Sequence, residues 1–196
     1  MNDNPPICLV ILAGGQSRRM GKDKAAISLD GERLVDRAVT KYRPLVDRIW
    51  LSAASDFDTG IDIISDDPDA PGGPVGAIFT IAAHLPILCP EAVGFITIPV
   101  DAPFAPDNLV QRLGTVAGCA VAQGPERLHP VFGYWRCDIL NSVRGTHEIG
   151  EQSPSLHWLA RQCDAQLVSW PDEEMFMNIN TPDDLAKAEA QRSRSK

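Results

Sequence analysis

The sequence predicts an α/β protein built on a single doubly wound, mostly parallel sheet. Short apolar runs rich in β-branched residues alternate with segments of helical periodicity, most clearly in the first half of the chain. Such runs are typical of buried parallel strands, and their alternation with helices is typical of a doubly wound sheet. Hydrophobic residues make up 44% of the 196 residues, which is enough for one large core. We therefore expect a single domain over residues 1–196.

The expected strands are the apolar runs themselves. They cover residues 7–12, 48–51, 61–64, 93–100, 119–123, 131–136 and 166–170. In a doubly wound sheet the ligand crevice lies at the carboxyl ends of the strands. Segments that follow these runs are therefore the first places to look for a site.

Helices are expected between the strands and at the end of the chain. They cover residues 34–42, 75–85, 106–116, 155–163 and 181–192. Pro44 ends the first, and Pro74 opens the second, because proline is favoured in a first helical turn. Asp107 lies near the start of the third, where a negative charge complements the helix dipole.

The segment 12–24, which reads LAGGQSRRMGKDK, has the features of a phosphate-binding loop. Small residues at Ala13, Gly14 and Gly15 allow backbone N–H groups to approach an anion closely. Four positive charges follow within seven residues, although the whole chain carries a net charge of −8. These cations are Arg18, Arg19, Lys22 and Lys24. We predict a local anion pocket, with a simple tight turn as the alternative.

The overall composition excludes several classes of protein. The acidic balance, 18 basic against 26 acidic residues, argues against nucleic acid or an anionic membrane as the main partner. The five cysteines show no CxxC or Cys/His spacing, so neither a disulfide framework nor a zinc site is predicted. We expect no signal peptide and no membrane span, and therefore a cytoplasmic protein.

Five blocks of sequence, in order, resemble those of the molybdenum cofactor guanylyltransferases, a family of sugar-nucleotide-type nucleotidyltransferases. The blocks are the loop at 12–24, Asp66 with DPDAPGGPVGAI, ITIPVDAPFAPDNL at 96–109, the pair His129-Pro130, and NINTPDDL at 178–185. The resemblance covers nearly the whole chain. It implies a Rossmann-like nucleotidyltransferase fold with a nucleotide-binding half at about 1–105, an acceptor-binding half at about 106–196, and an acceptor-side insertion in the second half.

The resemblance also implies an activity. The phosphate of the molybdopterin (molybdenum) cofactor would attack GTP, giving the guanine dinucleotide form of the cofactor and pyrophosphate. GTP, molybdenum cofactor and Mg²⁺ are then the expected ligands, and proteins that deliver or receive the cofactor are expected as transient partners.

Asp101 is the expected metal ligand. It follows an apolar strand and precedes Ala102-Pro103, so its carboxylate should project from the strand end toward the glycine loop. Magnesium prefers one or two carboxylates together with phosphate oxygens and water. A turn or capping role is the alternative from the residue alone, and the resemblance of ITIPVDAPF to a metal-binding block favours the metal.

The remaining catalytic residues are expected in the glycine loop. Arg19 and Lys24 would neutralise the triphosphate and the departing pyrophosphate, because phosphoryl-type transfer depends largely on stabilising spread charge. Arg18 and Lys22 are expected to face solvent. The nucleotide-binding residues of this loop are Leu12, Ala13, Gly14, Gly15 and Lys24.

A base pocket is expected around Asp66, whose carboxylate can accept hydrogen bonds from N1–H and the N2 amine of guanine together. An ordinary acidic loop with Asp67 and Asp69 is the alternative. Gly73 would form the floor of this pocket. Ser52 stands where the family often has asparagine, and a hydroxyl offers fewer hydrogen-bonding sites than an amide.

The acceptor-binding residues implied by the resemblance are His129, Asn178 and Asn180. A histidine beside proline is otherwise a structural turn. The asparagines have an alternative as well, since Thr181 can cap the last helix and leave them in the turn before it.

Other functions stay open at this point. A transferase that uses CTP or another phosphate acceptor would need the same loops. A nicotinamide-dependent oxidoreductase would need GxGxxG and an acidic residue after the second strand, where this chain has Ser52. A non-catalytic nucleotide sensor would not need the cations or Asp101.

Overall fold

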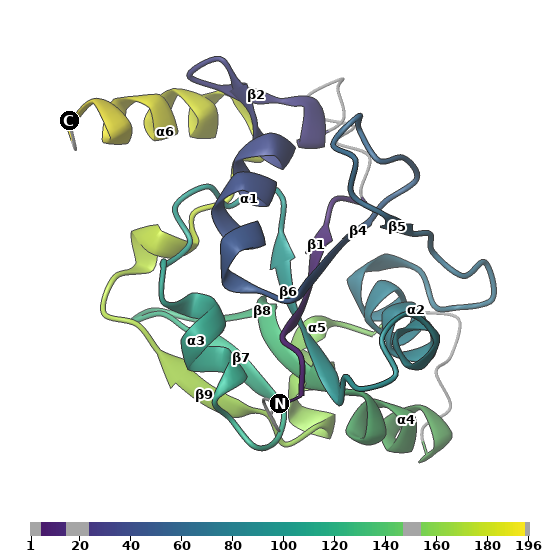
Figure 1. Ribbon diagram of the computed structural model, residues 1–196. Helices are drawn as coiled ribbons and strands as arrows, with labels where there is room; N and C mark the ends of the chain where they lie inside the picture. The colour runs from purple at the N-terminus through teal and green to yellow at the C-terminus, as the bar shows by residue number, and fades with distance from the viewer. Residues whose placement is uncertain (1–4, 15–23, 147–153, 195–196) are drawn as a thin grey trace.

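A computed structural model describes residues 5–14, 24–146 and 154–194 of the chain (Figure 1). In this part the main feature is a seven-stranded sheet, accompanied by a two-stranded hairpin. The sheet contains β1 (Cys8–Leu12), β4 (Arg48–Ser52), β5 (Ile63–Ile64), β6 (Gly94–Pro99), β7 (Ala120–Gln123), β8 (Leu128–Arg136) and β9 (Gln166–Ser169). All seven correspond to strands expected from the apolar runs.

The strand order is β5-β4-β1-β6-β8-β7-β9, and only β8 runs antiparallel to its neighbours. From β1 the chain builds β4 and β5 on one side and then crosses to β6 on the other. Such a reversal of strand order opens a crevice at the carboxyl ends of the central strands. The predicted fold class, a mostly parallel α/β sheet, is confirmed.

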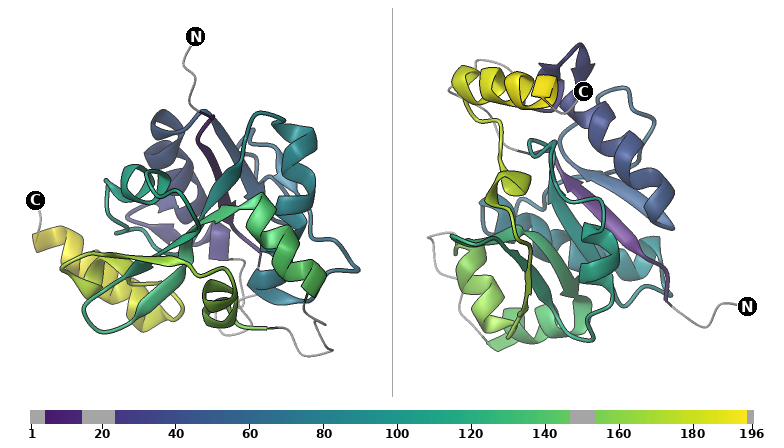
Figure 2. Two further views of the ribbon diagram at one scale, coloured as in Figure 1. Left: turned by 90° about the horizontal axis from the view of Figure 1, so that it is seen from below. Right: turned by 90° about the vertical axis from the view of Figure 1, so that its left-hand side faces the viewer.

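Helices cover both faces of the sheet (Figure 2). They are α1 (Leu34–Tyr42), α2 (Gly73–Leu88), α3 (Leu109–Gly114), α4 (Cys137–Thr146), α5 (Leu156–Gln162) and α6 (Pro182–Arg194), with 3₁₀ turns η1 (Lys24–Ala26), η2 (Arg43–Leu45) and η3 (Glu173–Phe176). None of the helices in the described ranges has both the length and the apolar character that a membrane span requires.

The two faces of β1 show how the sheet divides the core. Leu9 and Ile11 pack with residues of α1 and α3, whereas Cys8 and Val10 pack with residues of α2, α4 and α5. Side chains alternate between faces along a strand, so a continuous apolar run supplies both layers. This explains why β1 is apolar at every position.

Two elements were not expected from the sequence. The hairpin of β2 (Ser28–Leu29) and β3 (Glu32–Arg33) has strands too short to show alternation, although its turn residues Asp30 and Gly31 both have positive φ angles, 52° and 81°. Helix α4 begins directly after β8, without an intervening turn signal. In Figures 1 and 2, α6 lies beside this hairpin.

Helix α3 is shorter than the expected 106–116. The carbonyl of Pro106 accepts a hydrogen bond from Leu109 N at 3.1 Å, which forms a turn before the helix begins. Asp107 pairs with Lys41 of α1 at 2.9 Å instead of standing in the first helical turn. Asp107 therefore precedes the N-cap residue Asn108 and is not part of the helix in whose first turn it was expected.

A close backbone approach fixes the start of α2. A Cβ on Gly76 would lie 1.5 Å from the carbonyl oxygen of Pro71. Gly76→Ala should therefore lower the free energy of unfolding by at least about 2 kcal/mol, measured by urea denaturation. Gly145→Ala in α4 is the control, since nothing lies within 4 Å of the added carbon; it should be neutral or stabilising by up to about 1 kcal/mol. An unchanged Gly76→Ala midpoint would contradict the clash.

Candidate functional site

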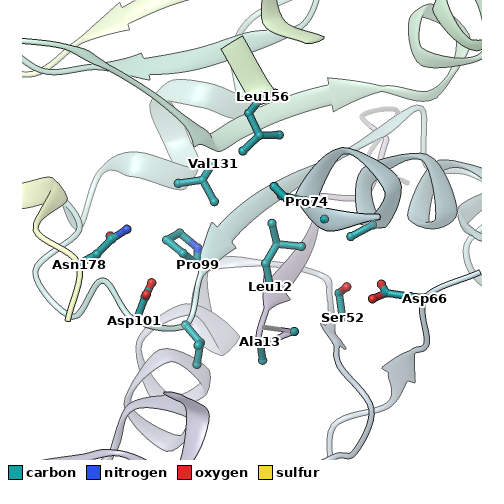
Figure 3. Close-up of a pocket in the computed structure, with 14 residues that line it drawn as sticks. Leu12, Ala13, Ser52, Asp66, Pro74, Pro99, Asp101, Val131, Leu156 and Asn178 are labelled. Carbon is teal, nitrogen blue, oxygen red and sulfur yellow. The ribbon is translucent and has the colours of Figure 1, made fainter. Parts of the chain in front are cut away.

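A cavity of about 570 Å³ opens at the carboxyl ends of the parallel strands (Figure 3). Its size is within the range of small-molecule sites, about 300–1,000 Å³. Its walls come from the last residues of β1, β4 and β6, from the residues that follow β1, β5 and β6, from the start of α2, and from three places in the second half of the chain. The lining residues are Leu12, Ala13, Gly14, Ser52, Asp66, Gly73, Pro74, Ala77, Pro99, Val100, Asp101, Val131, Leu156 and Asn178.

The end of β1 is held on both sides where it enters the cavity. Ala13 N donates to the carbonyl of Ser52 at 3.0 Å, and Val100 N donates to the carbonyl of Leu12 at 3.1 Å. The parallel pairing thus continues to the last residue before the glycine loop. A Cβ on Gly14 would lie 4.0 Å from Asp66 Oδ2, so no side chain separates the loop backbone from that carboxylate.

Asp66 and Ser52 form one end of the cavity. Figure 3 shows the Asp66 carboxylate directed toward Ser52, which is 3% exposed at the end of β4. The neighbouring acid Asp67 instead accepts a hydrogen bond from Asp69 N at 2.9 Å in a local turn. The two neighbouring acids therefore differ in role: Asp66 faces the cavity, and Asp67 stabilises the turn.

Asp101 and Asn178 form the other end (Figure 3). Asp101 is 5% exposed just beyond β6, and its backbone carbonyl accepts a hydrogen bond from Ile179 N at 2.8 Å. This bond places the segment 178–180 beside Asp101. The side-chain oxygen Oδ1 of Asn178 is buried and has no hydrogen-bond donor among the described residues.

The side chains of Asp101 and Asn178 fit a magnesium ion whose other ligands are supplied by a substrate. A carboxylate and an amide oxygen are oxygen ligands of the kind that hard cations prefer. Within the described ranges there is no cluster of three or more His, Cys, Asp or Glu residues that could hold a metal by itself. A metal at Asp101 would therefore need phosphate oxygens and water, which is the usual arrangement for Mg²⁺.

His129 and Asn180 are not among the cavity-lining residues. His129 lies in β8, 7% exposed, with Nε2 2.6 Å from Glu173 Oε1. Asn180 N donates to Asp184 Oδ2 at 3.0 Å.

Thr181 caps the last helix, as the alternative interpretation of this segment predicts. Thr181 N donates to Asp184 Oδ2 at 2.9 Å, and Asp184 N donates back to Thr181 Oγ1 at 3.2 Å. The hydrogen bonds from Thr181 and Asn180 lower the pKa of Asp184 below its ordinary value. Asn178 differs from Asn180, because its side chain faces the cavity.

The cationic part of the glycine loop lies outside the described residues. This applies to Gly15, Arg18, Arg19 and Lys22, and to the side chain of Lys24. Their roles stay predictions from the sequence.

Five lining residues had not been assigned a role from the sequence. Ala77 lies in α2, within the block DPDAPGGPVGAI. Pro99 and Val100 precede Asp101 and could have been found as its neighbours, and Val131 follows the His129-Pro130 pair. Leu156 carries no such signal. It lies at the start of α5, where Ser155 caps the helix by accepting from Trp158 N at 3.1 Å.

A doubly wound sheet whose strand reversal holds a mostly apolar cavity with a few polar side chains, beside a glycine loop, defines an α/β protein of the nucleotide-binding class. Residues 9–166 match the model of the MobA-like NTP transferase domain, and the chain belongs to that family of nucleotidyltransferases.

Two curated relatives are named molybdenum cofactor guanylyltransferase. The protein from Cereibacter sphaeroides (strain ATCC 17029) is 34% identical over 188 residues, covering 92% of this chain and 94% of the relative. The protein from Rhodopseudomonas palustris (strain BisB5) is 33% identical, with 96% and 95% covered.

A solved structure shows the same fold. It is the molybdopterin-guanine dinucleotide biosynthesis protein A from Archaeoglobus fulgidus, which superposes with a TM-score of 0.69 at 23% identity. The match covers 96% of this chain and 100% of that chain.

Asp101→Asn should preserve the fold and lower the rate of nucleotidyl transfer by at least about a hundredfold, because a neutral amide cannot balance the charge of a metal. Nucleotide-dependent Mn²⁺ binding, followed by electron paramagnetic resonance, should weaken in parallel. Asp69→Asn is the control, because this exposed carboxylate does not line the cavity. Near wild-type turnover in folded Asp101→Asn protein would refute the metal assignment.

Proposed function

We propose that this chain transfers GMP from GTP to the phosphate of the molybdopterin (molybdenum) cofactor. The products are the guanine dinucleotide form of the cofactor and pyrophosphate. The observation that supports this most is that one cavity contains Asp66 at one end, Asp101 and Asn178 at the other, and the beginning of the glycine loop between them (Figure 3). The guanylyltransferase names of the curated relatives support the same activity.

The reaction needs a phosphate oxygen of the acceptor to attack the α-phosphorus of GTP. A new P–O bond forms there, and the bond to the β-phosphate breaks and releases pyrophosphate. No covalent enzyme intermediate is required, so the protein contributes mainly by positioning and by stabilising charge. Bound Mg²⁺, held by Asp101 with Asn178 beside it, would supply positive charge to the phosphates.

The backbone at Ala13 and Gly14 would lie along the phosphates. The Ala13 N–H is already bonded to the carbonyl of Ser52, which keeps this segment rigid, so of the two amides the Gly14 N–H is the one that would bind a phosphate. Arg19 and Lys24 would add the charge that the triphosphate and pyrophosphate require. They follow Gly14 by five and ten residues in the sequence, within the same segment 12–24.

The guanine would lie at the Asp66 end. An ionised carboxylate there accepts from N1–H and the N2 amine, a pair of donors that adenine lacks. Gly73, with a φ angle of 78°, and Pro74 would bound this pocket at the start of α2. Ser52 would contact the nucleotide through its hydroxyl.

The acceptor would occupy the side of the cavity nearer Asn178. Val131, which lies above Pro99 in Figure 3, and Leu156, which lies above Leu12 and Pro74, give the cavity an apolar wall suited to a flat ring system. These residues come from the second half of the chain, as a division into a nucleotide half and an acceptor half requires. Asn180 and His129 would support this region without lining the cavity.

We further propose Mg²⁺ as the natural metal, a cytoplasmic location, and transient contacts with proteins that deliver or receive the cofactor. The strongly acidic composition favours neither nucleic acid nor an anionic membrane as a partner.

The deciding experiment incubates the protein with molybdenum cofactor, Mg²⁺ and each nucleoside triphosphate in turn. Mass analysis of the cofactor should give the guanine dinucleotide with GTP only. A cytosine dinucleotide would instead identify a cytidylyltransferase, and pyrophosphate release with another phosphate acceptor would identify a different transferase. Binding of nucleotide with no pyrophosphate release would indicate a sensor.

Asp66→Asn should reduce the preference for GTP over ATP and CTP more than it reduces turnover with the best nucleotide. A site built around hydrogen bonds discriminates by leaving its own groups unpaired with the wrong ligand. The measurement is kcat/KM for each nucleotide. Ser52→Asn is the matched change in the same pocket and should leave the preference for GTP equal or improved. Unchanged selectivity in Asp66→Asn would remove the guanine assignment and leave the phosphate chemistry intact.

Lys24→Ala and Arg19→Ala should each lower the rate of transfer and also weaken GTP binding, because both cations would face the triphosphate before and during the reaction. Lys22→Ala should have a much smaller effect. Steady-state kinetics and nucleotide titration measure both quantities. Greater sensitivity at Lys22 than at Lys24 would show that the loop is oriented differently.

A further inference from the structure

Glu173 is the centre of a cluster of hydrogen bonds outside the cavity. Its Oε1 lies 2.6 Å from His129 Nε2 and 3.0 Å from Arg127 Nε, and its Oε2 accepts from Glu126 N at 3.2 Å. A Cβ at Gly124 would stand 2.1 Å from Oε2. The absence of a side chain at Gly124, in the turn between β7 and β8, therefore leaves room for the carboxylate.

The protonation states in this cluster follow from its surroundings. Burial lowers the pKa of His129 below its ordinary value, although the bond to Glu173 opposes this effect. Burial acts to raise the pKa of Glu173, but the hydrogen bonds from Glu126 N and His129 outweigh it and lower that pKa. Because an ionised carboxylate can only accept, Nε2 of His129 carries the hydrogen in its 2.6 Å contact with Glu173.

A second contact joins the same two segments. The ring of His129 stacks on Phe176, with ring centroids 4.4 Å apart and an angle of 21° between the planes. Phe176 ends η3, the turn that Glu173 begins, and is 1% exposed. Both ends of η3 are thus attached to His129 in the central sheet.

The attachment of η3 to His129 matters for the cavity because η3 directly precedes the segment that carries Asn178. Asn178 follows η3 after a single residue, and the next residue, Ile179, is bonded to the backbone of Asp101. The segment that carries Asn178 is consequently held at two points, by His129 and Glu173 before it and by Asp101 after it. Its side-chain oxygen can then stay buried in the cavity without a protein donor.

We propose that Glu173 and His129 are positioning residues, which hold the side chain of Asn178 in the orientation that transfer requires. His129 acts through Glu173 and η3 and makes no contact with the acceptor. The proposal rests on the proposed function for its kinetic consequences, whereas its structural consequence can be measured without substrates.

Glu173→Gln is the sharpest variant, because it keeps the size of the side chain. Donors face both carboxylate oxygens, so the new NH₂ group meets a donor whichever way the amide is turned. The value of kcat should fall by about tenfold, and KM for GTP should change by less than about twofold. Glu174→Gln is the matched control. Glu174 lies in the same turn, is exposed, and accepts a hydrogen bond from Gln191 Nε2 at 3.2 Å. It should change kcat by less than about twofold.

The two amide replacements of His129 test which ring nitrogen matters. Glutamine can place an NH₂ donor near the position of Nε2, whereas asparagine can place one only near Nδ1. His129→Gln should therefore retain more activity than His129→Asn. The reverse order would overturn the proposal, since it would point to a role for Nδ1.

A double-mutant cycle tests whether the effect passes through Asn178. In an Asn178→Ala background, Glu173→Gln should lower kcat by less than about twofold, because the side chain that it positions is already absent. A full tenfold loss in that background would overturn the proposal. It would mean that Glu173 acts on the reaction by another route.

Hydrogen–deuterium exchange of the backbone over residues 173–181 tests the structural part without substrates. Exchange there should be about tenfold faster in Glu173→Gln than in the wild type or in Glu174→Gln, with the strands of the sheet unchanged. Unchanged exchange would overturn the proposal, and faster exchange in every strand would do so as well, by indicating general destabilisation. If exchange behaves as expected and the wild type forms no guanine dinucleotide, only the proposed function fails.

Discussion

The site depends on the pairing of β1 with both of its neighbours up to its last residue. The carbonyl of Leu12 accepts from Val100, and the amide of Ala13 donates to Ser52. These bonds fix where the glycine loop leaves the sheet, and they also set the positions of the residues after β4 and β6. Because the strand order reverses at β1, the chain leaves an opening where these three strand ends meet.

The polar side chains in this opening have separate structural supports. Asp66 stands in a loop whose shape is maintained by Asp67 and by the close approach of Pro71 to Gly76. The position of Asn178 depends on η3, which precedes it, and on the backbone bond between its neighbour Ile179 and Asp101, which lies far earlier in the chain. The Asp66 end of the cavity is therefore built by local structure, and the Asn178 end by contacts between distant segments.

The sequence predicted the parts of this arrangement that local patterns encode. Buried strands appear as apolar runs, so all seven strands of the sheet were found, and residues directly after those runs, such as Ser52 and Asp101, were correctly expected at the carboxyl edge. The hairpin at Asp30-Gly31 was missed because two-residue strands show no periodicity. Leu156 was missed because nothing in its neighbourhood indicates that α5 begins at the cavity.

His129 shows why the rest could not be predicted. Its resemblance to a family pair implied a place near the acceptor, whereas the structure shows its contacts with Glu173 and Phe176 of η3 and does not include it among the residues that line the cavity. Glu173 lies 44 residues away in sequence, within a run of acidic residues that a solvated surface turn explains equally well. What distinguishes it from Glu174 is that a glycine at 124 leaves room for its carboxylate. Such a fit between residues that are distant in sequence produces no periodic pattern, so it cannot be predicted from a single sequence.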